Sequence, residues 1–259
     1  MVTHHHMRNS LRGRGPIHGF WSTTAHPTVI DAACSLGPDF VCIDAQHGVD
    51  LSTLTTDTFT TMAYYDVPGL VRVAGNEPAD IGRALDLGAA GVMVPMINTA
   101  QEAKQAVAAC RYAPRGTRSF GMQTVRVDPL SREYESVCAV QIETAEAITN
   151  IMEIAAIDGV DWLYIGPADL TLSMGGTPAS DVMSIFDGSH PLATELLTAF
   201  EAVVDAAKAH EKLAGLHTNS GQATRTAEEL GFRVASVATD LVEMRNGMND
   251  QLKAARNKG

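Results

Sequence analysis

The chain has 259 residues, of which 45% are hydrophobic and 19% charged, and its 30 acidic and 19 basic side chains give a formal charge of -11. This length suits one large α/β domain or two small ones, and the apolar fraction excludes an intrinsically disordered chain. The acidic balance argues against a nucleic-acid partner, and no apolar run reaches the length of a membrane span. A single compact barrel is therefore the first expectation.

Cysteine usage and the N-terminal segment indicate the compartment and the domain limits. The chain contains four cysteines that are far apart and form no CxxC pair: Cys34, Cys42, Cys110 and Cys138. We expect all four to be reduced packing residues of a cytoplasmic protein. Residues 1–15 include a histidine triplet and several arginines without the apolar core of a signal peptide, which predicts a tag-like or disordered tail. Residues 16–259 are expected to form a single domain.

Short β-rich runs alternate with helical patterns from about residue 16 onward. Eight runs have the composition of buried strands: Gly19–Thr23, Phe40–Ala45, Gly69–Val73, Gly91–Met96, Cys138–Glu143, Trp162–Gly166, Ala214–Thr218 and Val234–Thr239. The segments between them carry apolar residues three and four positions apart, which is typical of amphipathic helices. Thr99 with Glu102, and Asp240 with Glu243, have the spacing found at helix starts.

This alternation predicts parallel strands joined by right-handed helical crossovers. Eight such units in about 250 residues correspond to a TIM (β/α)8 barrel. A doubly wound sheet is disfavoured, because neither a GxGxxG turn nor a GxxxxGK[ST] loop follows any expected strand. Two connections, residues 115–136 and 172–191, are longer than a simple link requires, and we expect them to be active-site loops.

Polar side chains lie at or just after the carboxyl ends of several expected strands, where TIM-barrel sites are built: Asp44, His47, Arg72, Gln141, Glu143 and Asp169. The alternation of side chains along a strand places Gln141 and Glu143 on one face and their apolar neighbours on the other. Because the apolar face should meet the helices, Gln141 and Glu143 are expected to point into the barrel. The same reasoning points Arg72 inward.

An inward carboxylate costs roughly several kcal/mol unless a cation accompanies it, so Glu143 requires a partner. One interpretation is a structural ion pair between Arg72 and Glu143. The other is a divalent metal held by Glu143 and Asp169, with positions left for waters and a chelating substrate. Such an oxygen-rich site suits Mg²⁺ or Mn²⁺, and Co²⁺ is a further candidate. His47 taken alone is equally compatible with a structural role, and only its place among these strand ends favours a functional one.

The lysines argue against Schiff-base chemistry. Five occur, and none ends an expected strand: Lys104, Lys208, Lys212, Lys253 and Lys258. A Schiff-base mechanism needs a desolvated lysine in the site, so it is disfavoured. Stabilisation of a carbanion is then expected from a metal and Arg72.

Five runs in this order resemble motifs of the metal-dependent (class II) pyruvate aldolases of the phosphoenolpyruvate/pyruvate-barrel superfamily, the group typified by 4-hydroxy-2-oxoheptanedioate aldolase. They are FVCIDAQHG at 40–48, LDLGAAGVMVP at 85–95, RYAPRGTR at 111–118, QIET at 141–144 and IGPADL at 165–170. The similarity extends from about residue 17 to the C-terminus.

The resemblance implies a role for each residue at the strand ends. Glu143 and Asp169 would be the metal ligands, and Arg72 would steady the enolate oxygen at C2 of the substrate. His47 would take part in proton transfer, with the carboxylate of Asp44 beside it.

Further residues would form the substrate pocket. By the same resemblance, Gln141 would contact the pyruvate moiety, and the backbone of Gly166, Pro167 and Ala168 would contact its carboxylate. Leu216, together with the two long loops, is expected to shape the pocket for the aldehyde.

Asp86 is expected to act outside its own subunit. It lies about 100° from the apolar stripe of its helix, so it does not face its own core, and an ordinary solvated aspartate would fit this position. It also matches a family aspartate that reaches a neighbouring subunit's site and pairs with the histidine there. The resemblance implies a homohexamer with shared active sites, in which the last helix, about residues 240–257, is exchanged between subunits.

These features together predict an aldehyde-lyase. The expected reaction is the reversible aldol cleavage of 4-hydroxy-2-oxo acids to pyruvate, or a close analogue, and an aldehyde through a metal-stabilised enolate. The alternatives are an oxaloacetate decarboxylase or a CoA-thioester lyase of the same superfamily. A non-catalytic barrel is disfavoured, because a scaffold has no need for buried acids.

Overall fold

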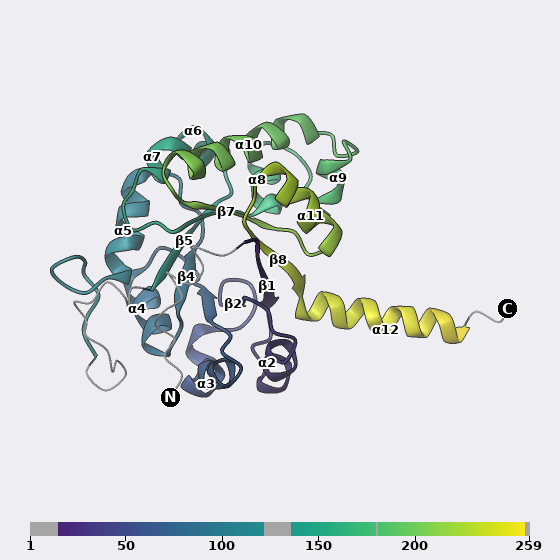
Figure 1. Cartoon of the computed structure of the whole chain (residues 1–259), viewed down its shortest axis with the longest axis horizontal. Helices are drawn as coiled ribbons and strands as arrows, with labels where there is room; N and C mark the ends of the chain where they lie inside the picture. The colour runs from purple at the N-terminus through teal and green to yellow at the C-terminus, as the bar shows by residue number, and fades with distance from the viewer. Residues whose placement is uncertain (1–14, 122–135, 180, 257–259) are drawn as a thin grey trace.

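The computed structural model describes residues 15–121, 136–179 and 181–256. Its centre is a closed barrel of eight parallel strands, each paired with its neighbours in the chain, with β8 closing on β1 (Figure 1). The strands are β1 Ile17–Ser22, β2 Phe40–Asp44, β3 Gly69–Arg72, β4 Gly91–Val94, β5 Val137–Ile142, β6 Trp162–Ile165, β7 Leu213–His217 and β8 Val234–Thr239. The predicted TIM barrel and all eight predicted strands are confirmed.

Helices cover the outside of the barrel. They are α2 Pro27–Cys34, α3 Thr56–Tyr64, α4 Pro78–Asp86, α5 Ala100–Cys110, α6 Ala145–Thr149, α7 Ile151–Ala155, α8 Pro167–Ser173, α9 Met183–Phe186, α10 Ala193–Ala209, α11 Gly221–Leu230 and α12 Asp240–Arg256, with a short 3-10 turn, η2, at Leu51–Thr53. The predicted cap at Thr99 is a complete capping box, because Thr99 and Glu102 each accept a backbone N–H from the other. The predicted start at Asp240 is also confirmed.

The alternation of side chains along the strands divides the core into two layers. Residues such as Val140 and Ile142 pack outward against the helices, whereas Trp162 and Tyr164 fill the barrel interior. All four cysteines are buried free thiols, as predicted. The interior of the barrel is therefore packed largely with apolar side chains, and the polar groups that line the cavity lie at the carboxyl ends of the strands.

The last helix differs from the others in having no buried residue. Figure 1 shows α12 extending away from the barrel after β8. Four apolar side chains along it are exposed: Val242, Met244, Met248 and Leu252. Its first residue, Asp240, is bound to the barrel, because its carboxylate accepts hydrogen bonds from Ser22 at the end of β1 and from Thr23 and Thr24 just after it. Within the described ranges, no helix is long and apolar enough to cross a membrane.

Candidate active site

A cavity of about 330 Å³ opens at the carboxyl ends of the strands. It brings together nearly all of the residues predicted from the sequence: Asp44, His47, Arg72, Gln141, Glu143, Gly166, Pro167, Ala168 and Asp169. Two predicted residues, Asp86 and Leu216, do not line it. None of the described residues that line the cavity is a lysine.

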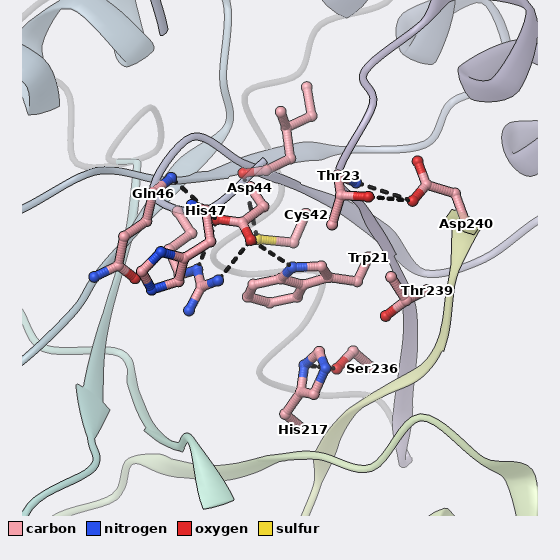
Figure 2. Close-up of polar contacts among 12 residues, drawn as sticks. Trp21, Thr23, Cys42, Asp44, Gln46, His47, His217, Ser236, Thr239 and Asp240 are labelled. Carbon is pink, nitrogen blue, oxygen red and sulfur yellow. Dashed lines mark hydrogen bonds and ion pairs between the residues drawn. The ribbon is translucent and has the colours of Figure 1, made fainter. Parts of the chain in front are cut away.

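Asp44, at the end of β2, organises one side of the cavity. Its carboxylate accepts hydrogen bonds from Arg72 Nε at 2.9 Å and Arg72 Nη2 at 2.5 Å, and from the backbone N–H groups of Gln46 and His47 (Figure 2). The indole of Trp21 points at the same carboxylate, with Nε1 3.4 Å from Oδ2. Burial alone would raise the pKa of Asp44, but the hydrogen bonds and charge of Arg72 outweigh it and lower that pKa.

Arg72 is therefore paired with Asp44 and not with Glu143. The ion pair between Arg72 and Glu143 that the sequence left open is wrong, since the two bonds to Asp44 are the ones the structure records for this guanidinium. The register of the barrel is the reason, because Asp44 on β2 lies directly opposite Arg72 on β3. The guanidinium also lies over the ring of Trp21, 4.9 Å from the ring centroid.

Glu143 follows β5 and is buried, with only 2% of its surface exposed. One carboxylate oxygen accepts the backbone N–H of Met96 at 2.8 Å, and among the described residues no cation forms an ion pair with it. Burial raises the pKa of Glu143 to about 7; the Met96 N–H opposes this shift, and the nearby charge of Asp169 reinforces it. A Cβ at Gly166 would lie 2.4 Å from the second oxygen, so the glycine leaves that oxygen open to the cavity.

These observations test whether a divalent metal fits. The buried carboxylate of Glu143 forms no ion pair with the described residues, although the charge of Arg72 reaches it; Asp169 is close enough to affect its pKa, and Gln141 Oε1 is a buried oxygen without a hydrogen-bond partner. Oxygen donors of this kind suit a hard divalent cation. No group of three or more His, Cys, Asp or Glu side chains gathers in the part of the chain that the structure describes. Two carboxylates would therefore leave most coordination positions to water and substrate.

His47 and Asp86 lie in different environments. His47 is exposed in the loop after β2, and it lines the cavity. Its backbone N–H donates a hydrogen bond to the carboxylate of Asp44. Asp86, at the end of α4, forms an ion pair of 2.7 Å with Arg118 of the same chain. That contact lies outside the cavity of this chain, so the action of Asp86 on a neighbouring site stays a prediction.

The prediction that Leu216 shapes the pocket is wrong. Leu216 is fully buried and packs outward in the layer between strands and helices. Because alternate residues of a strand face opposite sides, the residue of β7 that lines the cavity is His217. Sequence reasoning missed His217 and Trp21, although the alternation rule that placed Gln141 correctly would have found both on strands β7 and β1.

The family model described as "HpcH/HpaI aldolase/citrate lyase" matches residues 18–247. The chain belongs to this family. The resemblance recognised in the sequence motifs is confirmed over most of the chain, and the cavity lies where barrels of this architecture carry their sites.

Curated relatives support the membership. A hydroxypyruvate/pyruvate aldolase from Cupriavidus necator is 31% identical over 93% of this chain and 89% of its own length. A 4-hydroxy-2-oxo-heptane-1,7-dioate aldolase from Salmonella dublin is 30% identical over 93% of this chain and 90% of its own. A crystal structure of an HpcH/HpaI family protein from Burkholderia cenocepacia J2315 matches with a TM-score of 0.84 at 28% identity, covering 98% of this chain and 100% of that one.

Proposed function

We propose that the protein is a metal-dependent aldolase that reversibly cleaves 4-hydroxy-2-oxo acids to pyruvate, or a close analogue such as hydroxypyruvate, and an aldehyde. The observation that carries the proposal is the buried carboxylate of Glu143, which forms no ion pair with the described residues and opens onto the cavity that Asp169 and Arg72 also line. The names of the relatives from Cupriavidus necator and Salmonella dublin support the same substrate class.

Glu143 and Asp169 would hold the divalent ion, for which Mg²⁺, Mn²⁺ and Co²⁺ are the candidates. When bound, such an ion supplies positive charge that polarises a keto group and stabilises an enolate. Gln141 would orient the pyruvate moiety from the floor of the cavity. The backbone at Gly166 and Ala168 would hold its carboxylate.

Arg72 would stabilise negative charge on the C2 oxygen. Its pairing with Asp44 occupies Nε and one N–H of Nη2, so the Nη1 group and the second Nη2 proton remain for substrate. Asp44 and the stacked ring of Trp21 fix the plane of the guanidinium before substrate arrives. This preorganisation is what makes a charged donor effective in catalysis.

His47 would act as the base. In cleavage, it would take the proton of the C4 hydroxyl as the C3–C4 bond breaks. The aldehyde carbonyl then forms at C4, and the electron pair of the broken bond passes to the enolate of pyruvate. A proton returned to C3 then completes pyruvate. Asp44 positions His47 through the backbone N–H of that residue.

The test is release of pyruvate from a panel of 4-hydroxy-2-oxo acids, measured with a coupled dehydrogenase. We expect activity to disappear after complete chelation with EDTA and to return with Mg²⁺, Mn²⁺ or Co²⁺. Activity that survives removal of all metal would contradict the proposal. Oxaloacetate serves as a parallel substrate, since its decarboxylation gives the same enolate, and faster turnover of oxaloacetate than of every aldol substrate would assign a decarboxylase instead.

We also propose that the protein is a homohexamer in which α12 packs on a neighbouring subunit and Asp86 contributes to a neighbouring site. The exposed apolar side chains of Met248 and Leu252 support a covering partner for this helix. Replacing both by glutamate is expected to weaken assembly, because each change removes about 1.5–3 kcal/mol of apolar burial and adds a charge. Analytical ultracentrifugation measures the effect, and Gln251→Glu on the same exposed helix is the matched control. A wild-type protein that sediments as an active monomer would contradict this proposal.

A further inference from the structure

His217 is a second histidine of the cavity, to which the proposed reaction gives no task. It ends β7 and faces Trp21, with the two ring centroids 4.8 Å apart and the rings nearly perpendicular. Its Nδ1 lies 2.8 Å from the hydroxyl of Ser236 on β8 (Figure 2). Its Nε2 forms no hydrogen bond with the described residues, and it is not a buried atom. This nitrogen is therefore open to a ligand in the cavity.

A buried relay determines which ring nitrogen carries the proton. The hydroxyl of Tyr164, inside the barrel, lies 2.6 Å from the hydroxyl of Ser236. Ser236 is its recorded partner, and a phenol proton without an acceptor would cost about 1–3 kcal/mol in this buried position. We therefore infer that Tyr164 donates to Ser236, whose own proton then needs an acceptor, and His217 Nδ1 is the other side-chain contact of that hydroxyl. With Nδ1 as an acceptor, the neutral imidazole carries its hydrogen on Nε2.

The surroundings keep both ends of this relay in the required protonation state. Burial raises the pKa of the Tyr164 phenol, which stays a donor. Burial, followed by the charge of Arg72, lowers the pKa of His217 to about 4, so the ring is neutral near pH 7. Gly215 is part of the same construction, because a Cβ there would lie 2.4 Å from the Tyr164 ring.

His217 lines the cavity beside Asn219, Thr239 and Val242, none of which carries a charge; the charges that act on it are those of the paired Arg72 and Asp44. The hydroxyl of Thr239 donates to Asn219 Oδ1 at 2.6 Å, which leaves the amide N–H groups of Asn219 as further donors. The proposed metal ligands, by contrast, follow β5 and β6. Hydrogen-bond donors without a carboxylate among them suit a ligand that presents hydroxyl oxygens.

We propose that His217 donates its Nε2–H to a hydroxyl oxygen on the aldehyde half of the substrate, and so selects hydroxylated aldehydes over alkyl aldehydes. The inference rests on the proposed aldolase function. It makes His217 a specificity-determining residue, with Ser236 and Tyr164 as positioning residues that hold its tautomer.

Glycolaldehyde and propionaldehyde form a matched pair of probes, since one carries a hydroxyl where the other carries a methyl group. We expect the wild-type protein to prefer glycolaldehyde in aldol addition to pyruvate. His217→Leu should lower kcat/KM for glycolaldehyde by about 10- to 100-fold, the value of one lost hydrogen bond to a substrate hydroxyl, and change propionaldehyde by less than about threefold. His217→Gln, whose amide N–H reaches a similar point, should restore most of the preference. Equal losses for both aldehydes would overturn the proposal.

A spectroscopic measurement keeps the proposal separate from the aldolase activity. In ¹⁵N-edited spectra of the imidazole, we expect the Nε2–H tautomer in the wild-type protein and a mixture of tautomers in Ser236→Ala. The Nε2–H signal should shift when glycolaldehyde is added in the presence of pyruvate and metal, and not with propionaldehyde. A wild-type ring protonated on Nδ1, or equal shifts with both probes, would overturn the inference even if the protein proved to have no aldolase activity.

Discussion

Glu143→Gln is expected to abolish tight binding of Mn²⁺ and to lower kcat for pyruvate release by about 10³-fold or more. The substitution keeps the shape of the side chain and removes its charge, and the several kcal/mol of transition-state stabilisation that a bound metal supplies correspond to a factor of this size. Isothermal titration with Mn²⁺ measures the binding. The matched control is Glu146→Gln, the same chemical change at an exposed position on α6, which should leave both quantities unchanged.

The pH dependence of metal binding provides a second readout for the same residue. Because the pKa of Glu143 is raised to about 7, a proton competes with the metal below this pH. Metal affinity should fall about tenfold per pH unit below pH 7 and level off above it. Without metal, the pH dependence of folding stability has the opposite sign. The pKa of Glu143 rises from its ordinary value of 4.5 to about 7 on folding, so ionisation of this group destabilises the folded state. Its contribution to the free energy of unfolding therefore declines as the pH rises from about 4.5 to about 7. Metal affinity independent of pH between 5 and 7 would contradict the role of Glu143.

The second large effect is expected at Arg72. Arg72→Met removes the cation that pairs with Asp44, whose side chain is only 3% exposed. Removing one partner of a buried ion pair costs about 3–5 kcal/mol of folding free energy. The same change removes the donors proposed for the enolate oxygen, so activity should be lost as well. Chemical denaturation and the pyruvate assay measure the two effects separately.

A double substitution distinguishes the structural part of this effect from the catalytic part. Arg72→Met combined with Asp44→Asn removes both charges and should recover much of the stability, while activity stays absent. Arg72→Lys keeps the positive charge but cannot form the bidentate hydrogen bonds to Asp44, so it should retain only a small part of the activity. An active double variant would show that Arg72 is needed only to neutralise Asp44.

The strand ends show how far side-chain alternation can predict a site. On β5, the pattern of apolar and polar residues correctly directed Gln141 into the barrel, and the same rule extended to Glu143 just beyond it. On β7, the same alternation places Leu216 on the outward face with Ala214, which contradicts its prediction as a pocket residue. A one-residue error in a strand exchanges the two faces, so Leu216 lies in the core and His217 in the cavity.

Local periodicity and the strand-helix order were sufficient to predict the barrel, a candidate site at the carboxyl ends of its strands, and most of the residues that line the cavity. Which of these residues touch depends on the closed barrel as a whole. Arg72 bonds to Asp44 because neighbouring strands place them in register, and Glu143 forms no ion pair with Arg72 because it lies two strands further around the barrel. The relay from Tyr164 through Ser236 to His217 likewise joins three strands. Register and closure are properties of the whole barrel, and no local pattern in the chain specifies them.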